Sequence, residues 1–162
     1  MTRLRHLDFR RDERGAAAAE MALVLPLLLA IMFGGFEAGH FFYTEQKIIK
    51  AVRDGARYAG RLPFDDYTCT GTTRSADIQE ITRTGKLTGG TALIDGWENA
   101  DITVTVTCDA GATDGIFKDL AGGARIVTVA ATAEYPSLFE TLGFIDSDST
   151  VNASAQSVVM GI

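Results

Sequence analysis

The stretch Gly15-Ala16-Ala17-Ala18-Ala19-Glu20 separates an arginine-rich head from a long apolar run, and this change of character decides the fold. The head, residues 1–15, carries five Arg. The run from Met21 to Phe36 contains no charged residue. Because a helix of about 20 residues crosses the hydrocarbon core of a bilayer, we expect residues 16–43 to form a transmembrane helix that ends in interfacial aromatic residues.

Glu20 is a carboxylate at the start of this apolar span. On insertion scales such a group costs about 2.5–3.5 kcal/mol at the bilayer centre, so it needs a partner. If the chain were cut after Gly15, Glu20 would be the fifth residue of the mature protein, near the new α-amino group of Ala16. Glu37 is a second carboxylate near the outer end of the span. It has two interpretations, a contact with a neighbouring subunit or solvation at the interface.

A small residue before the cut, four residues, a Glu and then an apolar helix make up the class III signal of type IV pilin-like proteins. The similarity continues beyond this signal. It is carried by Arg14-Gly15, Glu20, Leu25-Pro26-Leu27-Leu28-Leu29, Phe33-Gly34, Glu37, Gly39, Ala51 and Arg53-Asp54-Gly55-Ala56-Arg57-Tyr58-Ala59. Residues 14–60 therefore resemble the TadE-like pseudopilins of tight-adherence (Flp) pilus systems. The rest of the chain carries little family signature.

The resemblance implies a minor pilin that acts in pilus assembly, adhesion and biofilm formation. It implies a basic leader peptide over 1–15, cleavage between Gly15 and Ala16 by a prepilin peptidase, and roles in subunit assembly for Glu20 and Glu37. The implied partners are the inner membrane, the prepilin peptidase, other pilin subunits and the pilus assembly machinery. TadF-like and TadG-like subunits have similar N-termini, so their roles stay open.

Two other uses of the apolar segment are an ordinary signal peptide and an uncleaved anchor. A signal peptide fits poorly, because the candidate cuts place Phe33, Phe36 or Glu37 where a small residue is needed. Five basic residues flank the span on each side, so the positive-inside rule does not decide the orientation. The pilin-like signal and the cysteines favour a cytoplasmic N-terminus and a periplasmic C-terminal domain, in a single-pass protein of the bacterial inner membrane.

Beyond the span, residues 44–61 are predicted to form an amphipathic stalk helix that ends at Leu62-Pro63. The apolar arc of this helix is Ile48, Val52, Gly55, Ala56 and Ala59, and the opposite arc is Lys47, Lys50, Arg53, Arg57 and Arg61. Residues 62–162 are expected to form a small periplasmic domain with a helix over 75–87 and strands over 101–108, 124–135 and 150–160. The expected fold class is α+β, a long N-terminal helix packed on a small antiparallel sheet, as in pilins.

Cys69 and Cys108 both follow the span, and in a small exported domain such a pair is most simply a disulfide. Two unpaired buried thiols are the alternative. The domain over 62–162 has five basic and fourteen acidic residues, and this charge of −9 disfavours nucleic acid as a partner.

The sequence of the domain gives little indication of a catalytic function. The only histidines, His6 and His40, precede it, which excludes a Ser-His-Asp or Cys-His arrangement within it. The segment Asp146–Thr150 lacks the Gly and Glu of a calcium loop and is interpreted as an acidic turn. We expect no enzyme activity, no metal, no cofactor and no small-molecule substrate. A pilus subunit and a membrane-anchored binding or adhesion module are then the competing functions.

Overall fold

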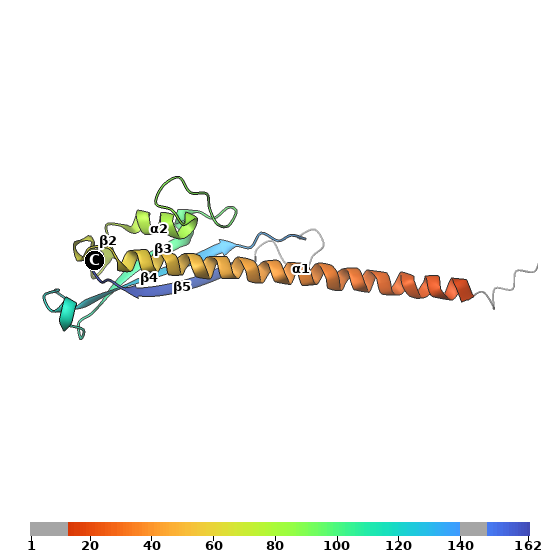
Figure 1. The fold of residues 1–162 in the computed structure, drawn as a ribbon, viewed down its shortest axis with the longest axis horizontal. Coiled ribbons are helices and arrows are strands. Elements are labelled where there is room, and N and C mark those ends of the chain that lie inside the picture. Colours follow the sequence, from red (N-terminus) through yellow and green to blue (C-terminus); the bar gives the residue numbers. More distant parts are fainter. Residues whose placement is uncertain (1–12, 140–148) are drawn as a thin grey trace, which may run out of the picture.

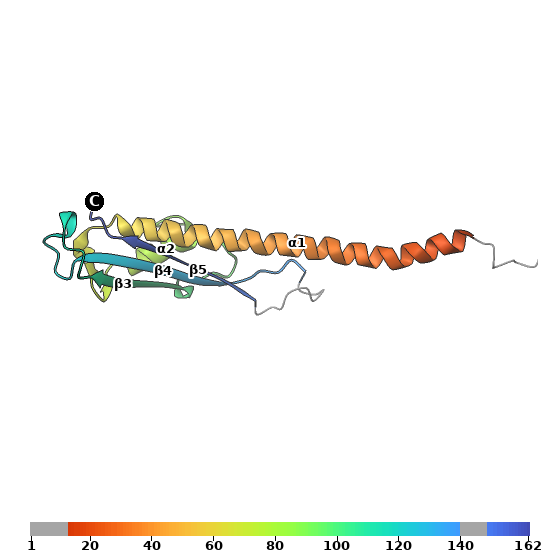
Figure 2. The ribbon, with the colours of Figure 1, turned by 90° about the horizontal axis from the view of Figure 1, so that it is seen from below.

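The computed structural model describes residues 13–139 and 149–162. Its dominant element is one helix, α1 (Glu13–Gly60), of 48 residues. At 1.5 Å per residue such a helix is about 72 Å long. Figures 1 and 2 show that its C-terminal half lies along a small domain and its N-terminal half projects far beyond it. The helix continues through Pro26, and no break separates the predicted span from the predicted stalk.

The other elements form the small domain. Its main sheet is antiparallel in the order β3-β4-β5. The strands are β3 (Ile102–Asp109), β4 (Ala124–Glu134) and β5 (Thr150–Val158). A small hairpin joins β1 (Tyr67–Thr68) to β2 (Gly71–Thr72), and it is followed by the helix α2 (Ser75–Thr84). Three short 3₁₀ turns lie at Phe64–Asp66, Asn99–Asp101 and Gly115–Phe117. The predicted fold class, a long helix on a small antiparallel sheet, is confirmed.

The helix predicted over 75–87 ends earlier than the sequence suggests. α2 stops at Thr84 because Gly85 adopts a left-handed conformation with φ of 74°, and its N–H bonds the carbonyl of Ile81. This is the usual way in which a glycine ends a helix. The predicted strands are found within two residues of their expected ends, and the predicted acidic turn lies largely in residues 140–148, outside the described part. The β1–β2 hairpin falls in a segment that the sequence predicts to be a loop.

The core lies between the sheet and the two helices. α1 packs against β4, β5 and α2, and α2 packs against β3. The apolar arc predicted for the stalk is buried, whereas Lys50, Arg53 and Arg57 on the opposite arc are exposed. The main buried side chains are Ile48, Val52, Ala56, Ala59, Ile78, Trp97, Ile102, Val127, Val129 and Val159. The helix therefore supplies one wall of the domain core.

Two glycines let α1 approach its neighbours closely. A Cβ atom on Gly55 would collide with Oγ1 of Thr82 in α2, and one on Gly60 would collide with Oγ of Ser157 in β5. Gly39 has no such neighbour within 4 Å. A side chain at either packed position would push the helix away from the domain.

A disulfide between Cys69 and Cys108 ties the β1–β2 hairpin to the end of β3. The two residues are 39 positions apart. Closing a loop of this length contributes about 4 kcal/mol in the chain-entropy model. This is a large share of the stability of a small domain, which is typically about 5–15 kcal/mol.

We predict that Gly55→Ala lowers the melting temperature of the full-length protein in detergent. Replacing Gly by Ala in a helix gains about 1 kcal/mol, but overpacking a filled core costs about 1–3 kcal/mol. Gly39→Ala, on the same helix with open space around it, is the matched control and should not lower the melting temperature. Near-ultraviolet circular dichroism from the buried Trp97 follows the transition.

A second variant makes the test specific to the contact. Combining Gly55→Ala with Thr82→Ala removes Oγ1, the atom that the new methyl group meets most closely, so the double variant should lose less stability than the two single losses summed. Additive losses, or a Gly55→Ala protein as stable as Gly39→Ala, would show that α1 and α2 are not in close contact.

Candidate functional site

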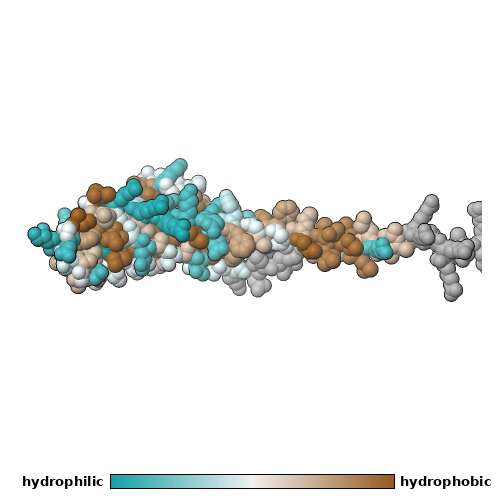
Figure 3. All heavy atoms as spheres, turned by 60° about the horizontal axis from the view of Figure 1, so that its bottom comes forward, coloured by the Kyte–Doolittle hydropathy of each residue, from teal (hydrophilic) through white to brown (hydrophobic). Residues whose placement is uncertain are grey.

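The projecting half of α1 is apolar and uncovered. Within the part of the chain that the structure describes, α1 is the one helix long and apolar enough to cross a membrane. Its most apolar 18-residue window has a mean hydropathy of 2.2 and contains no residue buried by the described part of the chain. This surface is the brown band beyond the domain in Figure 3. Because monomeric soluble proteins rarely expose so large an apolar surface, the helix is suited to lie in lipid.

Gly15, Ala16 and Glu20 lie on the first turns of α1, at the end remote from the domain. All three are exposed, and apart from the adjoining residues and backbone of α1 itself no described atom lies within 4 Å of the position of a Cβ on Gly15. Residues four apart are neighbours on one face of a helix. The structure therefore places Ala16 and Glu20 on the same side of α1, as the predicted pair requires.

Glu37 is held within its own chain. The residue is 1% exposed, because the segment that follows β4 covers it. Oε1 accepts a hydrogen bond of 2.8 Å from the Tyr135 hydroxyl, and Oε2 accepts one of 3.0 Å from the N–H of Phe139. The N–H of Leu138 lies 3.2 Å from both carboxylate oxygens. We call this cluster of Glu37, Tyr135, Leu138 and Phe139 the Glu37 clasp.

One aromatic contact and one hydrogen bond reinforce the clasp. The ring of Phe139 lies edge-to-face against Phe33, with centroids 5.0 Å apart. The Tyr135 hydroxyl also lies 3.0 Å from Nδ1 of His40. Burial raises the pKa of Tyr135, and its hydrogen bond to Glu37 raises it further, so the phenol keeps the proton that it donates.

The clasp corrects the sequence interpretation of Glu37. Solvation at the interface is wrong, because the carboxylate is buried and its oxygens accept hydrogen bonds from Tyr135, Leu138 and Phe139, which follow β4. A direct bond from this carboxylate to a neighbouring subunit would have to replace those contacts. The sequence gives no signal for the clasp, because most of its donors are backbone N–H groups about 100 residues away.

The exposed face of the stalk forms a basic stripe of Lys50, Arg53 and Arg57. With Gln46, Ile49 and Asp54 it lines a shallow surface hollow. Arg57 pairs with Asp54 at 4.0 Å, but the Arg57 side chain is 76% exposed. Surface pairs of this kind contribute about 0–1 kcal/mol, so the stripe matters little for stability and is available to a partner.

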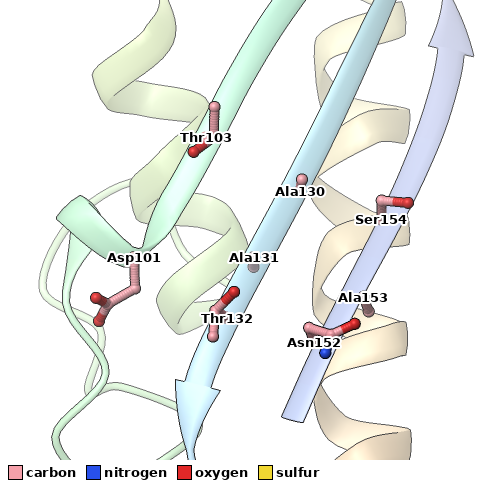
Figure 4. Close-up of a pocket in the computed structure, with 8 residues that line it drawn as sticks. All are labelled: Asp101, Thr103, Ala130, Ala131, Thr132, Asn152, Ala153 and Ser154. Carbon is pink, nitrogen blue, oxygen red and sulfur yellow. The ribbon is translucent and has the colours of Figure 1, made fainter. Parts of the chain in front are cut away.

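A second hollow lies on the open face of the main sheet, opposite the helices (Figure 4). It is lined by Asp101, Thr103, Ala130, Ala131, Thr132, Asn152, Ala153 and Ser154. The one carboxylate, that of Asp101, already accepts a 2.9 Å hydrogen bond from the N–H of Glu98. Among the described residues, no group of three His, Cys, Asp or Glu could hold a metal ion.

Comparison with known proteins adds one match. No curated protein and no solved structure matches the chain. A family model described as TadE-like protein matches residues 15–57. The match begins at Gly15, includes Glu20, Glu37 and the basic stripe, and ends before the domain, which agrees with the resemblance seen in the sequence. The N-terminal segment of this chain is therefore similar to TadE-like proteins.

Proposed function

We propose that this protein is a minor pilin, or pseudopilin, that acts in assembly of a tight-adherence pilus and thereby supports adhesion and biofilm formation. The observation that carries the proposal is the uncovered apolar half of α1, with Gly15 and Glu20 at its free end. A helix of this kind can be anchored in the inner membrane first and later pack against the same helix of other subunits. The protein has no catalytic role in this proposal.

Processing is the first step. The bond after Gly15 lies at the exposed start of α1, where a prepilin peptidase in the membrane has access to it. Cleavage removes a head with five Arg and creates an ammonium group on Ala16. This group lies on the side of the helix that carries Glu20.

Assembly is the second step. The Ala16 ammonium and the Glu20 carboxylate each cost free energy when they enter lipid, and pairing offsets part of that cost. A pair formed between neighbouring subunits would also fix how far one helix is shifted along the next. A membrane-anchored binding module, the alternative function, needs neither group.

We predict that Gly15→Val and Glu20→Ala fail at different steps. Gly15→Val should accumulate as a precursor that is heavier by the fifteen-residue leader, because the larger side chain hinders the peptidase at the bond. Glu20→Ala should still be cut but should not co-purify with other pilins, because it leaves the Ala16 ammonium unpaired in lipid. The mass of the protein from membrane fractions and its co-purification measure the two effects.

Matched controls are Gly15→Ala, which keeps a small residue at the cut, and Glu20→Asp, which keeps the charge. Gly15→Ala should be cleaved more completely than Gly15→Val. Glu20→Asp should co-purify with other pilins more than Glu20→Ala does. Normal maturation of Gly15→Val together with normal assembly of Glu20→Ala would overturn the proposal in favour of a plain anchor.

We also predict that the basic stripe serves assembly rather than folding. Replacing both Arg53 and Arg57 by Glu should reduce co-purification with other pilins while leaving the melting temperature almost unchanged. The matched control changes Lys86 and Lys118, two exposed residues of the domain, to Glu, with the same change in net charge. If both double variants behave alike in co-purification, or if the stripe variant melts many degrees lower, the stripe is not an assembly surface.

A further inference from the structure

The uncovered part of α1 is short for a membrane span. Among the described residues, contacts between α1 and the domain begin at Phe33, which leaves residues 16–32 as the part of the apolar helix free of those contacts. Seventeen residues of helix measure about 26 Å, whereas the hydrocarbon core of a bilayer is about 30 Å thick. With Ala16 at one boundary, the other boundary falls at the turn of α1 that carries Phe33, Phe36 and Glu37.

We infer that the turn after β4, Pro136–Phe139, is a second membrane contact, seated in the lipid of the leaflet from which α1 emerges. The Glu37 clasp fixes this turn to the helix at the level of the boundary. The Leu138 side chain is 54% exposed there, and Phe36 is exposed on the adjacent turn of α1. The protein thus meets the bilayer with a helix and a loop, and the partner of this surface is lipid.

The clasp makes the turn suitable for lipid. Backbone that enters a bilayer must have its N–H groups bonded. The N–H groups of Leu138 and Phe139 donate to Glu37, and residues 136–139 contain no charged side chain. The Glu37 carboxylate is in turn shielded from lipid by its own donors. This contact therefore satisfies two N–H groups of the turn and the carboxylate of the helix together.

The positions of the exposed aromatic residues on α1 are consistent with a membrane boundary near Glu37. Phe42 and Tyr43 are exposed and lie within two turns of Glu37 on the domain side. Aromatic residues of this kind gather at the interface between lipid and water. With the hydrocarbon boundary at the turn of Glu37, Phe42 and Tyr43 lie in this interface, and Leu138, which is bonded to Glu37, lies at its lipid side.

The test is a depth measurement on the full-length chain. Leu138→Cys is spin-labelled, which the paired Cys69 and Cys108 permit, and the protein is reconstituted at low density in phosphatidylethanolamine–phosphatidylglycerol liposomes. Power saturation compares the accessibility of the label to oxygen, which partitions into lipid, and to a water-soluble nickel chelate. The controls are Leu23→Cys on the uncovered helix and Ile116→Cys, which is 53% exposed in the domain.

We expect position 138 to resemble position 23, with oxygen accessibility exceeding nickel accessibility, and position 116 to show the reverse. A label at 138 that resembles the one at 116 would overturn the inference. So would a label from which both reagents are excluded, because protein rather than lipid would then cover the turn. No other pilus component is present, so these outcomes do not depend on the proposed pilin function.

A second variant tests the clasp itself. Adding Glu37→Ala to Leu138→Cys should raise nickel accessibility at 138 several-fold, because the turn loses its attachment to α1. The readings at 23 and 116 and the Trp97 signal should stay the same. An unchanged reading at 138 would show that Glu37 does not hold the turn at the membrane.

Discussion

A single unbroken helix, α1, has one half suited to lipid and the other half packed in a domain core. Over its first half α1 presents apolar side chains all round, which suits lipid, and over its second half only one arc is apolar, which suits a domain core. Because the backbone stays helical through both halves, the domain cannot turn freely on its anchor. The position of the sheet relative to the membrane is therefore set by α1, and every proposed function of this protein depends on that constraint.

Glu37 lies where the two environments meet. An unpaired carboxylate at this position would be costly in lipid and in the core alike. The chain meets the cost by supplying the Tyr135 hydroxyl and the N–H groups of Leu138 and Phe139. Removing a donor from such a buried group typically costs about 1–3 kcal/mol or more. The clasp therefore joins the membrane-proximal end of the domain to the helix, just as Gly55 and Gly60 join its distal end.

The sequence predicts the parts of the fold that depend on periodicity. The apolar run indicates the projecting helix, the arc from Ile48 to Ala59 indicates the buried face of the stalk, and the alternation of Thr with Ile and Val predicts β3. These patterns are strong because the polarity of each residue matches its own surroundings, so the pattern can be recognised without knowing which distant segments are in contact. The TadE-like match over 15–57 rests on the same segment.

What the sequence does not predict depends on contacts between distant segments. The pattern of α2 continues past Thr84, but the left-handed Gly85 ends the helix. The hairpin of β1 and β2 has two residues in each strand, too few for any alternation to appear. The partners of Glu37 are mainly backbone groups, which every residue other than proline possesses, so no residue type marks them. The hollow on the sheet likewise exists only once three strands are aligned.

Amide hydrogen exchange of the full-length protein in lipid bilayers, resolved along α1, tests most directly whether the span and the stalk are one helix. A single helix shared by membrane and domain predicts continuous protection from residue 16 to residue 60, including residues 40–46, where a separate span and stalk would be joined. Fast exchange over 40–46, with protection on either side, would contradict it, because the span and the domain would then be two bodies connected by a hinge.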